Sequence, residues 1–232
     1  VGLALLGAVI GIAKAFVDTA PTLDLAALDA QDKTSFIYDS EGNLITDYKG
    51  TEDRIMVSID EIPEMLQNAF IAVEDARFYE HNGVDVKRIV GALVANFTSG
   101  STQGGSTITQ QLVKNITGDD VQSPARKIRE IFRAMELEQN YSKDEILENY
   151  LNYIGFGGPI NGVQLASQKY FGKDVSELDI AEAASLAAIP KSPNTLNPFA
   201  GYEDEATGEF INTGKEDNKS RQKYVLLQMY DN

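Results

Sequence analysis

Residues 104–115 read Gly-Gly-Ser-Thr-Ile-Thr-Gln-Gln-Leu-Val-Lys-Asn, and this stretch decides how the middle of the chain folds. Its two glycines let the backbone approach a ligand closely, and Ser106 is a capping residue that opens a predicted helix. The N–H groups at the start of such a helix favour an anion such as a phosphate. Thr107, Gln111 and Lys114 fall at i, i+4 and i+7, which predicts a polar stripe ending in a cation. The structural alternative is an ordinary capped surface helix.

Helical periodicity continues on both sides of this stretch. From residue 62 onward, apolar residues recur at helical spacing and predict a helix that runs into Glu74. Further helices are predicted at 86–97, 107–116, 124–139, 143–153, 161–170 and 179–188. Short strands are predicted at 36–38, 44–46 and 55–57. The sequence therefore predicts a mainly α fold with a small β element near the N-terminus.

The two ends of the chain differ from its middle. Residues 1–17 are apolar apart from Lys14, so we expect the outer part of a membrane helix whose start is missing. A signal-peptide core and a buried helix are the alternatives. The polar, glycine-containing C-terminal segment is interpreted as a linker towards a further domain. The predicted parts are a membrane helix at 1–20, a β element at 34–60, a catalytic domain at 61–198 and a linker at 199–232.

Composition excludes several classes of function. The chain has 232 residues, 43% hydrophobic and 24% charged, which is the balance of a globular protein. With no Cys and one His, thiol catalysis, disulfides and His-rich zinc sites are excluded. A net charge of −15 argues against nucleic-acid binding, yet residues 77–133 carry eight Lys or Arg against five Asp or Glu. This basic centre indicates a small anionic substrate, or else solvated charges on helix faces.

Residues 74–81, Glu-Asp-Ala-Arg-Phe-Tyr-Glu-His, place two adjacent acids at the end of an apolar helix. Hydrophobic surroundings favour proton uptake by a carboxylate, which suits a general base or acid. His81 follows Glu74 by seven residues, about two helical turns, so we expect the two to share a face. The structural alternative is an acidic helix end with a capping histidine.

Two further groups contribute to the pattern. Arg126 and Glu130 stand four residues apart and are expected to pair on one face of a helix. Alone such a pair contributes little, but beside Lys114 it would place two cations and one acid around a pyrophosphate. Residues 141–152 predict a helix whose Ser-x-x-Glu start fits a capping box.

Together these groups resemble the peptidoglycan glycosyltransferase (transglycosylase) domain, glycosyltransferase family 51, of class A penicillin-binding proteins and monofunctional transglycosylases. The matching elements lie, in the family's order, at 74–81, 104–115, 126–130, 141–152, 170–173 and 186–194. The resemblance implies a lysozyme-like helical fold on the outer face of the bacterial cytoplasmic membrane, anchored by a single membrane pass. It also implies the reaction, which polymerises lipid II into β-1,4-linked glycan strands with inversion and releases undecaprenyl pyrophosphate.

The resemblance also assigns roles to individual residues. Glu74 matches the general base, and Glu130 matches the second essential acid on the leaving-group side. Lys114 and Arg126 match the residues that meet the pyrophosphate. The other expected substrate-binding residues are Asp75, Phe78, His81, Gly105, Ser106, Thr107, Gln111 and Asn115. Mg²⁺ or Mn²⁺ assists some family members, and no organic cofactor is implied.

The expected partners are lipid II, the growing glycan chain, the membrane and other cell-wall synthesis and division proteins. Two rival functions are a lysozyme-like glycan hydrolase and a scaffold that binds lipid-linked precursors without catalysis. The cations Lys114 and Arg126 argue against the hydrolase, while the intact acids Glu74 and Glu130 argue against the scaffold. Residues 220–223 fit S-x-x-K, but the chain has no S-D-N or K-T-G, so we reject them as transpeptidase residues. The tail that contains them resembles the linker into the transpeptidase domain of class A proteins, so we expect a truncated bifunctional enzyme, with a natural monofunctional enzyme as the alternative.

Overall fold

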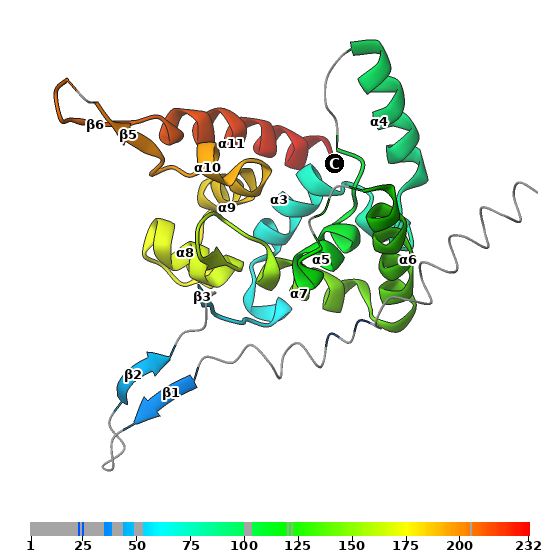
Figure 1. Cartoon of the computed structure of the whole chain (residues 1–232), viewed down its shortest axis with the longest axis horizontal. Coiled ribbons are helices and arrows are strands. Elements are labelled where there is room, and N and C mark those ends of the chain that lie inside the picture. Colours follow the sequence, from blue (N-terminus) through cyan, green and yellow to red (C-terminus); the bar gives the residue numbers. More distant parts are fainter. Residues whose placement is uncertain are drawn as a thin grey trace, which may run out of the picture. The chain divides into compact units, whose positions relative to one another are not determined.

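The computed structural model describes residues 23, 25, 35–38, 44–48, 53–99, 104–119, 121, 123–204 and 206–232 (Figure 1). The expected membrane segment at 1–20 lies outside these residues. The described residues are mainly helical, with three small two-stranded sheets, which confirms the predicted fold class at this level. Within this part of the chain, no helix combines the length and apolar character needed to cross a bilayer.

Backbone contacts divide the chain into two compact units, which are described one at a time. In the described chain, the first unit comprises residues 77–147 together with residue 23, and the second unit comprises 25–76 and 148–232. The chain passes from one unit to the other after Ala76 and again within helix α7 (Lys143–Tyr153).

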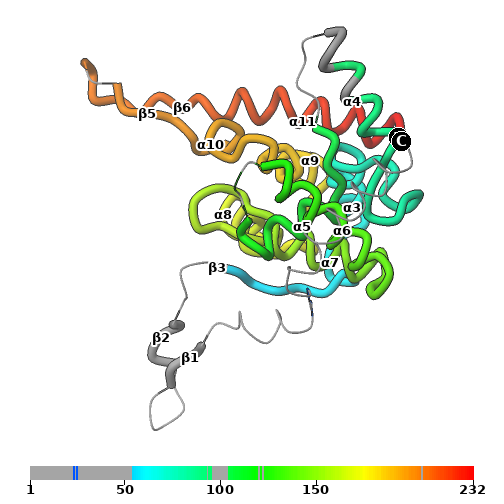
Figure 2. Tube along the Cα trace, turned by 45° about the vertical axis from the view of Figure 1, so that its right-hand side comes forward, coloured from blue at the N-terminus to red at the C-terminus, as the bar shows by residue number. Residues whose placement is uncertain are grey.

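The first unit consists of helices joined by short loops. Its elements are the 3-10 helix η2 (Phe78–Glu80), α4 (Val86–Ser99), α5 (Ile108–Thr117), α6 (Pro124–Asn140) and the first turn of α7. Helices α5 and α6 pack against each other (Figure 2). Ile108 and Leu112 on α5, and Ala134 and Leu137 on α6, are fully or almost fully buried. Their i, i+4 and i, i+3 spacing is the apolar stripe that predicts these helices.

Both ends of α5 follow local sequence signals, but its N-cap lies one residue later than predicted. Thr107, rather than Ser106, is the N-cap: its Oγ1 accepts from the Gln110 amide at 3.2 Å. The Gln110 side chain accepts from the Thr107 amide at 3.0 Å, which completes a capping box. The helix ends before Gly118, whose φ of +60° is a left-handed conformation that favours glycine.

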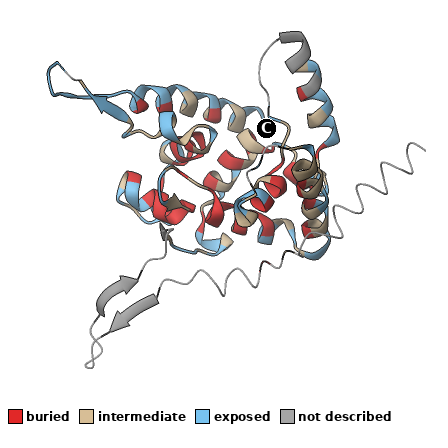
Figure 3. Cartoon of the chain, viewed as in Figure 1, coloured by how far each residue is buried: buried red, intermediate tan, exposed pale blue. Residues whose placement is uncertain are grey.

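The second unit is built around three helices that pack against one another: α3 (Glu64–Glu74), α9 (Ile180–Ala188) and α11 (Gly214–Asp231). Helices α8 (Val163–Phe171) and α10 (Pro193–Leu196) complete its helical part. Fully buried Phe70 on α3 meets the rings of Tyr150 and Phe156 edge-on, at 6.1 and 6.2 Å between centroids. Most residues of α8 and α9 are buried, as the red ribbon in Figure 3 shows. Apolar burial therefore holds this unit together.

Three short strand pairs belong to the second unit. Strand β1 (Ser35–Tyr38) pairs antiparallel with β2 (Leu44–Tyr48), in the region predicted as β. Strand β3 (Asp53–Arg54) pairs in parallel with β4 (Ile160–Asn161). Strand β5 (Gly201–Glu203) forms an antiparallel hairpin with β6 (Phe210–Asn212).

The predicted strand at 55–57 is wrong, and side chains explain why. The Asn152 side chain accepts from the Val57 amide at 3.0 Å and donates to the Val57 carbonyl at 2.8 Å. The Glu148 carboxylate accepts from the Ile59 amide at 2.6 Å. These two side chains of α7 satisfy backbone groups that a neighbouring strand would otherwise satisfy, so the segment forms no strand pairing.

Helix α11 lies within the segment predicted as a linker, and it is fixed to the second unit by a buried amide. Asn218 on α11 donates to the carbonyls of Ser185 at 3.1 Å and Leu196 at 2.8 Å. It also accepts from the Ser185 hydroxyl at 2.6 Å. Because Asn218 is 4% exposed and its side chain bonds to α9 and α10, α11 is part of the folded second unit.

Candidate active site

The residues predicted to act on substrate fall in both units. Glu74 and Asp75 belong to the second unit. The other ten belong to the first unit, namely Phe78, His81, Gly105, Ser106, Thr107, Gln111, Lys114, Asn115, Arg126 and Glu130. Each set is therefore described within its own unit.

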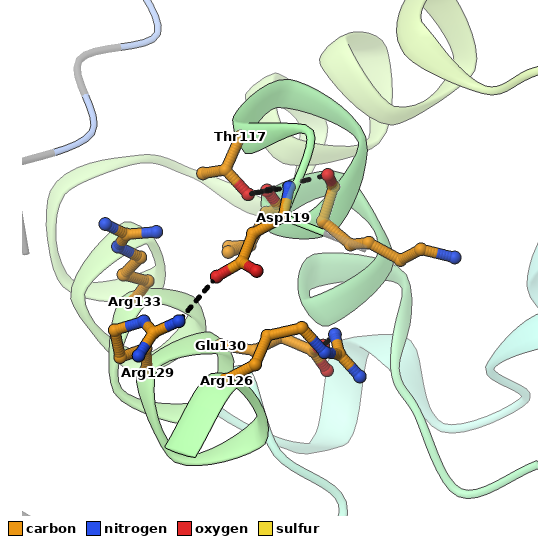
Figure 4. Close-up of a pocket in the computed structure, with 8 residues that line it drawn as sticks. Thr117, Asp119, Arg126, Arg129, Glu130 and Arg133 are labelled. Carbon is orange, nitrogen blue, oxygen red and sulfur yellow. Dashed lines mark hydrogen bonds and ion pairs between the residues drawn. The ribbon is translucent and has the colours of Figure 1, made fainter. Parts of the chain in front are cut away.

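A pocket in the first unit lies between charged side chains of α5, α6 and the loop that joins them (Figure 4). It is lined by Val113, Lys114, Thr117, Asp119, Arg126, Arg129, Glu130 and Arg133, and its empty space of about 180 Å³ includes solvent at the pocket's opening. Four cations and two carboxylates line it, so its net charge is +2. We call it the anion pocket, because this excess of positive charge attracts negatively charged ligands.

Glu130 is the buried acid of the anion pocket, with 5% of its surface exposed. The Arg126 guanidinium donates to one of its oxygens at 2.5 Å, and the Lys127 ammonium pairs with the other. Lys127 also donates to the Ser106 hydroxyl at 2.8 Å, which ties α6 to the loop before α5. Glu130 therefore holds two cations in fixed positions before any ligand binds.

Lys127 was missed by the sequence interpretation, although a signal was present. It stands three residues before Glu130, and i, i+3 neighbours lie on the same helix face as i, i+4 neighbours. The predicted pair of Arg126 with Glu130 is confirmed, and Lys127 extends it to a triad.

The α5 residues divide into exposed and buried members. Lys114 and Asn115 are exposed and Gln111 is half-buried, so the predicted polar stripe is accessible along this part of the helix. Thr107 is fully buried, and its hydroxyl donates to the Gly83 carbonyl at 2.7 Å. The structure therefore gives Thr107 a role in the fold, and its contact with substrate stays a prediction. Half-buried Gly105 lies in the loop before α5, beside α4.

Phe78 and His81 belong to a short segment that one lysine holds in place. The Lys143 ammonium donates to the His81 carbonyl at 2.7 Å and lies 4.3 Å from the centre of the Phe78 ring. It also pairs with Glu138 at 2.7 Å, and Glu138 accepts from the Thr109 hydroxyl at 2.6 Å. One ion pair thus links residues 78–81 to α5, α6 and α7. Because Phe78 is fully buried, it supports this segment from inside.

Arg77 and Asp85 fix the beginning of α4. Two nitrogens of Arg77 donate to both Asp85 oxygens at 2.6 to 3.1 Å, and the Arg88 amide donates to Asp85 at 2.9 Å. Burial alone would raise the pKa of Asp85, but the Arg88 amide and the Arg77 guanidinium outweigh it and hold that pKa below its ordinary value. Asp85 thus caps α4 as a paired carboxylate.

The second unit contributes the other acidic pair. Glu74 is the last residue of α3 and is half-buried, whereas Asp75 after it is fully buried. The Asp75 amide donates to the Ile71 carbonyl at 2.9 Å, and its φ and ψ of −162° and 68° end the helix there. Leu66 and Phe70 of the same helix are fully buried, so Glu74 does end an apolar helix as predicted.

The chain matches a known protein family and several known proteins. The family described as Transglycosylase matches residues 41–230. The chain is 39% identical to penicillin-binding protein 1A of Clostridium perfringens strain 13, over all of this chain and 34% of that protein. It is 50% identical to penicillin-binding protein 1A/1B of Bacillus subtilis, over 78% of this chain and 20% of that one. It is also 48% identical to penicillin-binding protein 1F of B. subtilis, over 72% of this chain and 23% of that protein.

These relatives are much longer than the present sequence. The chain spans about a third or less of the length of the curated relatives it matches. It also aligns with a crystal structure of penicillin-binding protein 1A from Haemophilus influenzae, at 25% identity and a TM-score of 0.43, over 91% of this chain and 19% of that one. The family assignment does not depend on that alignment. On the match over residues 41–230, this chain belongs to the transglycosylase family.

Proposed function

We propose that this chain is a peptidoglycan glycosyltransferase that polymerises lipid II into β-1,4-linked glycan strands for the bacterial cell wall. The observation that carries the proposal is the anion pocket, in a chain that belongs to the transglycosylase family. Lipid II is a disaccharide-pentapeptide on undecaprenyl pyrophosphate, and its pyrophosphate is a negatively charged group of the kind that this pocket attracts. A soluble glycan hydrolase has no need of such a pocket.

The proposed reaction is an inverting displacement. The GlcNAc 4-hydroxyl of lipid II attacks the anomeric carbon of the terminal MurNAc of the growing chain. The bond from that carbon to the pyrophosphate oxygen breaks, and undecaprenyl pyrophosphate leaves with the electron pair. Negative charge therefore grows on the leaving oxygen, where cations that are already in place stabilise the transition state.

Lys114 and Arg126 are assigned to the leaving pyrophosphate. Both line the anion pocket, and Arg126 is held by the buried Glu130 carboxylate. Glu130 acts as a positioning residue in this scheme, because it fixes Arg126 and Lys127 rather than attacking the sugar. Guanidinium groups suit this task, since their paired N–H groups match two phosphate oxygens.

Glu74 is assigned as the general base that removes the proton of the attacking hydroxyl. Its position at the end of an apolar helix supports this role. Buried Asp75 beside it, together with Phe78, His81 and the α5 residues, is assigned to binding and orienting the two substrates.

Several finer points belong to the same proposal. We assign a lysozyme-like arrangement of the helices and a single membrane pass in residues 1–20, with the catalytic domain on the extracytoplasmic face. The apolar composition of residues 1–17 and a lipid-linked substrate support this location. Further cell-wall synthesis and division proteins are proposed partners, and a transpeptidase domain is proposed for the longer protein.

Assistance by Mg²⁺ or Mn²⁺ belongs to the same proposal. The described residues include no group of three or more His, Asp or Glu side chains that could hold a metal ion. We assign the cation to the substrate's phosphates, which would bring it to the site.

The test uses the purified chain in detergent with labelled lipid II, analysed on a gel that resolves glycan length. We expect a ladder of polymer from the unaltered protein and none from Glu74→Gln, because removing a general base costs about 10²- to 10⁴-fold in rate. Glu64→Gln is the matched control, since Glu64 is exposed in the first turn of the same helix. Shortening of preformed glycan instead of polymer would establish the hydrolase, and lipid II binding without turnover would establish the scaffold.

A further inference from the structure

The anion pocket contains two arginines that the assigned reaction does not use. Arg126, Arg129 and Arg133 fall at i, i+3 and i+7 on α6, and all three line the pocket. Figure 4 shows Arg129 and Arg133 together on one side, with Arg126 and Glu130 extending on the other. Neither Arg129 nor Arg133 has a role in the leaving-group pair of Lys114 and Arg126.

Arg133 has donor capacity to spare. Its Nε is buried and has no hydrogen-bond partner among the described residues, and the same is true of the Nε of Arg126. A buried donor without an acceptor is costly, so such an atom is usually satisfied by a ligand or by water. Two unsatisfied guanidinium nitrogens that belong to lining residues of one positively charged pocket indicate an anionic ligand with several acceptor oxygens.

Arg129 is paired with Asp119, and an anionic ligand could replace this carboxylate. Its Nη2 donates to Asp119 Oδ2 at 2.8 Å, and the two side chains keep 27% and 25% of their surface exposed. Asp119 follows Gly118, the left-handed residue that ends α5, so the turn delivers a carboxylate to the pocket. A carboxylate and a phosphate present the same kind of oxygen pair to a guanidinium group.

We propose that Arg129 and Arg133 form a second anion subsite beside Lys114 and Arg126, in which Asp119 is an internal competitor for the substrate's pyrophosphate. The inference rests on the proposed function and extends it. In the free protein, Asp119 neutralises Arg129. When pyrophosphate enters, a phosphate oxygen replaces the Asp119 carboxylate on Arg129, and Arg133 supplies further donors. No covalent step is involved.

This exchange affects both binding and release. Displacing Asp119 costs the ion pair with Arg129, so the competitor lowers the affinity of the pocket for pyrophosphate. After glycosyl transfer, the same carboxylate can return to Arg129 as the undecaprenyl pyrophosphate leaves. A product that carries more negative charge than the substrate would otherwise be held by four cations.

The test measures binding of inorganic pyrophosphate to the full chain by isothermal titration calorimetry. We expect Asp119→Asn to lower the dissociation constant about fivefold, since a partly exposed ion pair no longer has to be broken. Asp144→Asn removes the same charge from an exposed position at the start of α7 and is expected to change the dissociation constant less than about twofold.

Variants at Arg133 test the other half of the subsite. Arg133→Gln is expected to raise the dissociation constant about fivefold, and Arg133→Lys, which keeps the charge but loses the fork of donors, to give a smaller rise. Lys87→Gln removes a cation from an exposed position on α4 and is the matched control. Thermal unfolding of each variant shows whether it is folded. If Arg133→Gln is not folded, the binding test rests on Arg133→Lys.

The outcomes separate this inference from the proposed function. Equal dissociation constants for the unaltered protein, Asp119→Asn and Asp144→Asn would overturn the competitor, and unchanged binding by Arg133→Gln and Arg133→Lys would overturn the subsite. If pyrophosphate does not bind while lipid II is still polymerised, the second subsite fails alone. If neither binding nor polymerisation occurs, the proposed function fails with it.

Discussion

The anion pocket of the first unit and the helical core of the second are stabilised in opposite ways. In the pocket, charged side chains such as Arg126, Lys127 and Glu130 are fixed by one another. In the core, fully buried rings such as Phe70 and Tyr150 exclude water, and few charges take part. Ion pairs therefore hold the charged side chains of the pocket in place, whereas apolar packing positions the helix that carries Glu74. Substitutions in the two regions should therefore affect different measurements.

The largest expected effect is on stability, from Phe70→Ala. Removing a fully buried ring leaves a cavity beside Tyr150 and Phe156, so the free energy of unfolding should fall by about 4 kcal/mol. Urea denaturation followed by circular dichroism measures this. Leu227→Ala, at a position on α11 that is 58% exposed, is the control and should change it by less than about 0.5 kcal/mol. Equal losses for both variants would contradict a core centred on Phe70.

A smaller effect, on binding rather than stability, is expected from Lys114→Ala. Lys114 is exposed, so its removal should leave the urea midpoint almost unchanged. It should weaken binding of a pyrophosphate-bearing ligand about tenfold, because a charge-assisted contact of roughly 1.4 kcal/mol is lost. Titration calorimetry with a short-chain lipid diphosphate measures this, with Lys87→Gln as the control. A loss of stability without a loss of affinity would reverse the contrast between the two regions.

The smallest effect concerns pH and the Arg77–Asp85 pair. Because the pKa of Asp85 in the folded chain lies below its ordinary value of 3.8, the pair stabilises the fold at higher pH. That stability is lost as the pH falls below the ordinary value and through the lowered pKa. Asp85→Asn keeps a capping side chain but loses the charge, so it should cost about 1 kcal/mol at pH 7.

The measurement for Asp85 is the free energy of unfolding between pH 7 and pH 3. The unaltered protein should lose more stability over this range than Asp85→Asn, and the difference between the two curves should become smaller toward the acid end. Asp144→Asn is the control for removing a carboxylate at an exposed position of the same unit. Parallel curves for the unaltered protein and Asp85→Asn would show that Asp85 does not titrate with folding.

Most helices were predictable because their signals are local. The predicted helices at 86–97, 124–139 and 143–153 agree with α4, α6 and α7 within about two residues at each end. The cap of α5 was placed one residue early because Ser106 and Thr107 are both good capping residues. The strand predicted at 55–57 was wrong because side chains nearly a hundred residues away, on α7, satisfy its backbone.

The site was predictable where partners lie on one helix and not where they come from two. The spacing of Arg126 and Glu130 is readable in the sequence, and the structure confirms their contact. The pairing of Asp119 with Arg129 depends on where α5 ends and on how its last turn packs against α6. The spacing of residues in the sequence does not predict either of these. For the same reason, the ion pair of Glu138 with Lys143 beneath Phe78 was not foreseen.

Gly83 and Gly118, two of the glycines with positive φ, set different limits on which substitutions this sequence can accept. At Gly83, with φ of +84°, an added Cβ would lie 2.6 Å from the Ala134 carbonyl oxygen, a backbone atom that cannot swing aside. At Gly118, with φ of +60°, the surrounding space is open, so a replacement meets only the strain of the backbone angle, which asparagine tolerates better than most side chains. Descendants of this protein can therefore vary the turn that carries Asp119, and with it the strength of the competitor, while position 83 admits glycine alone.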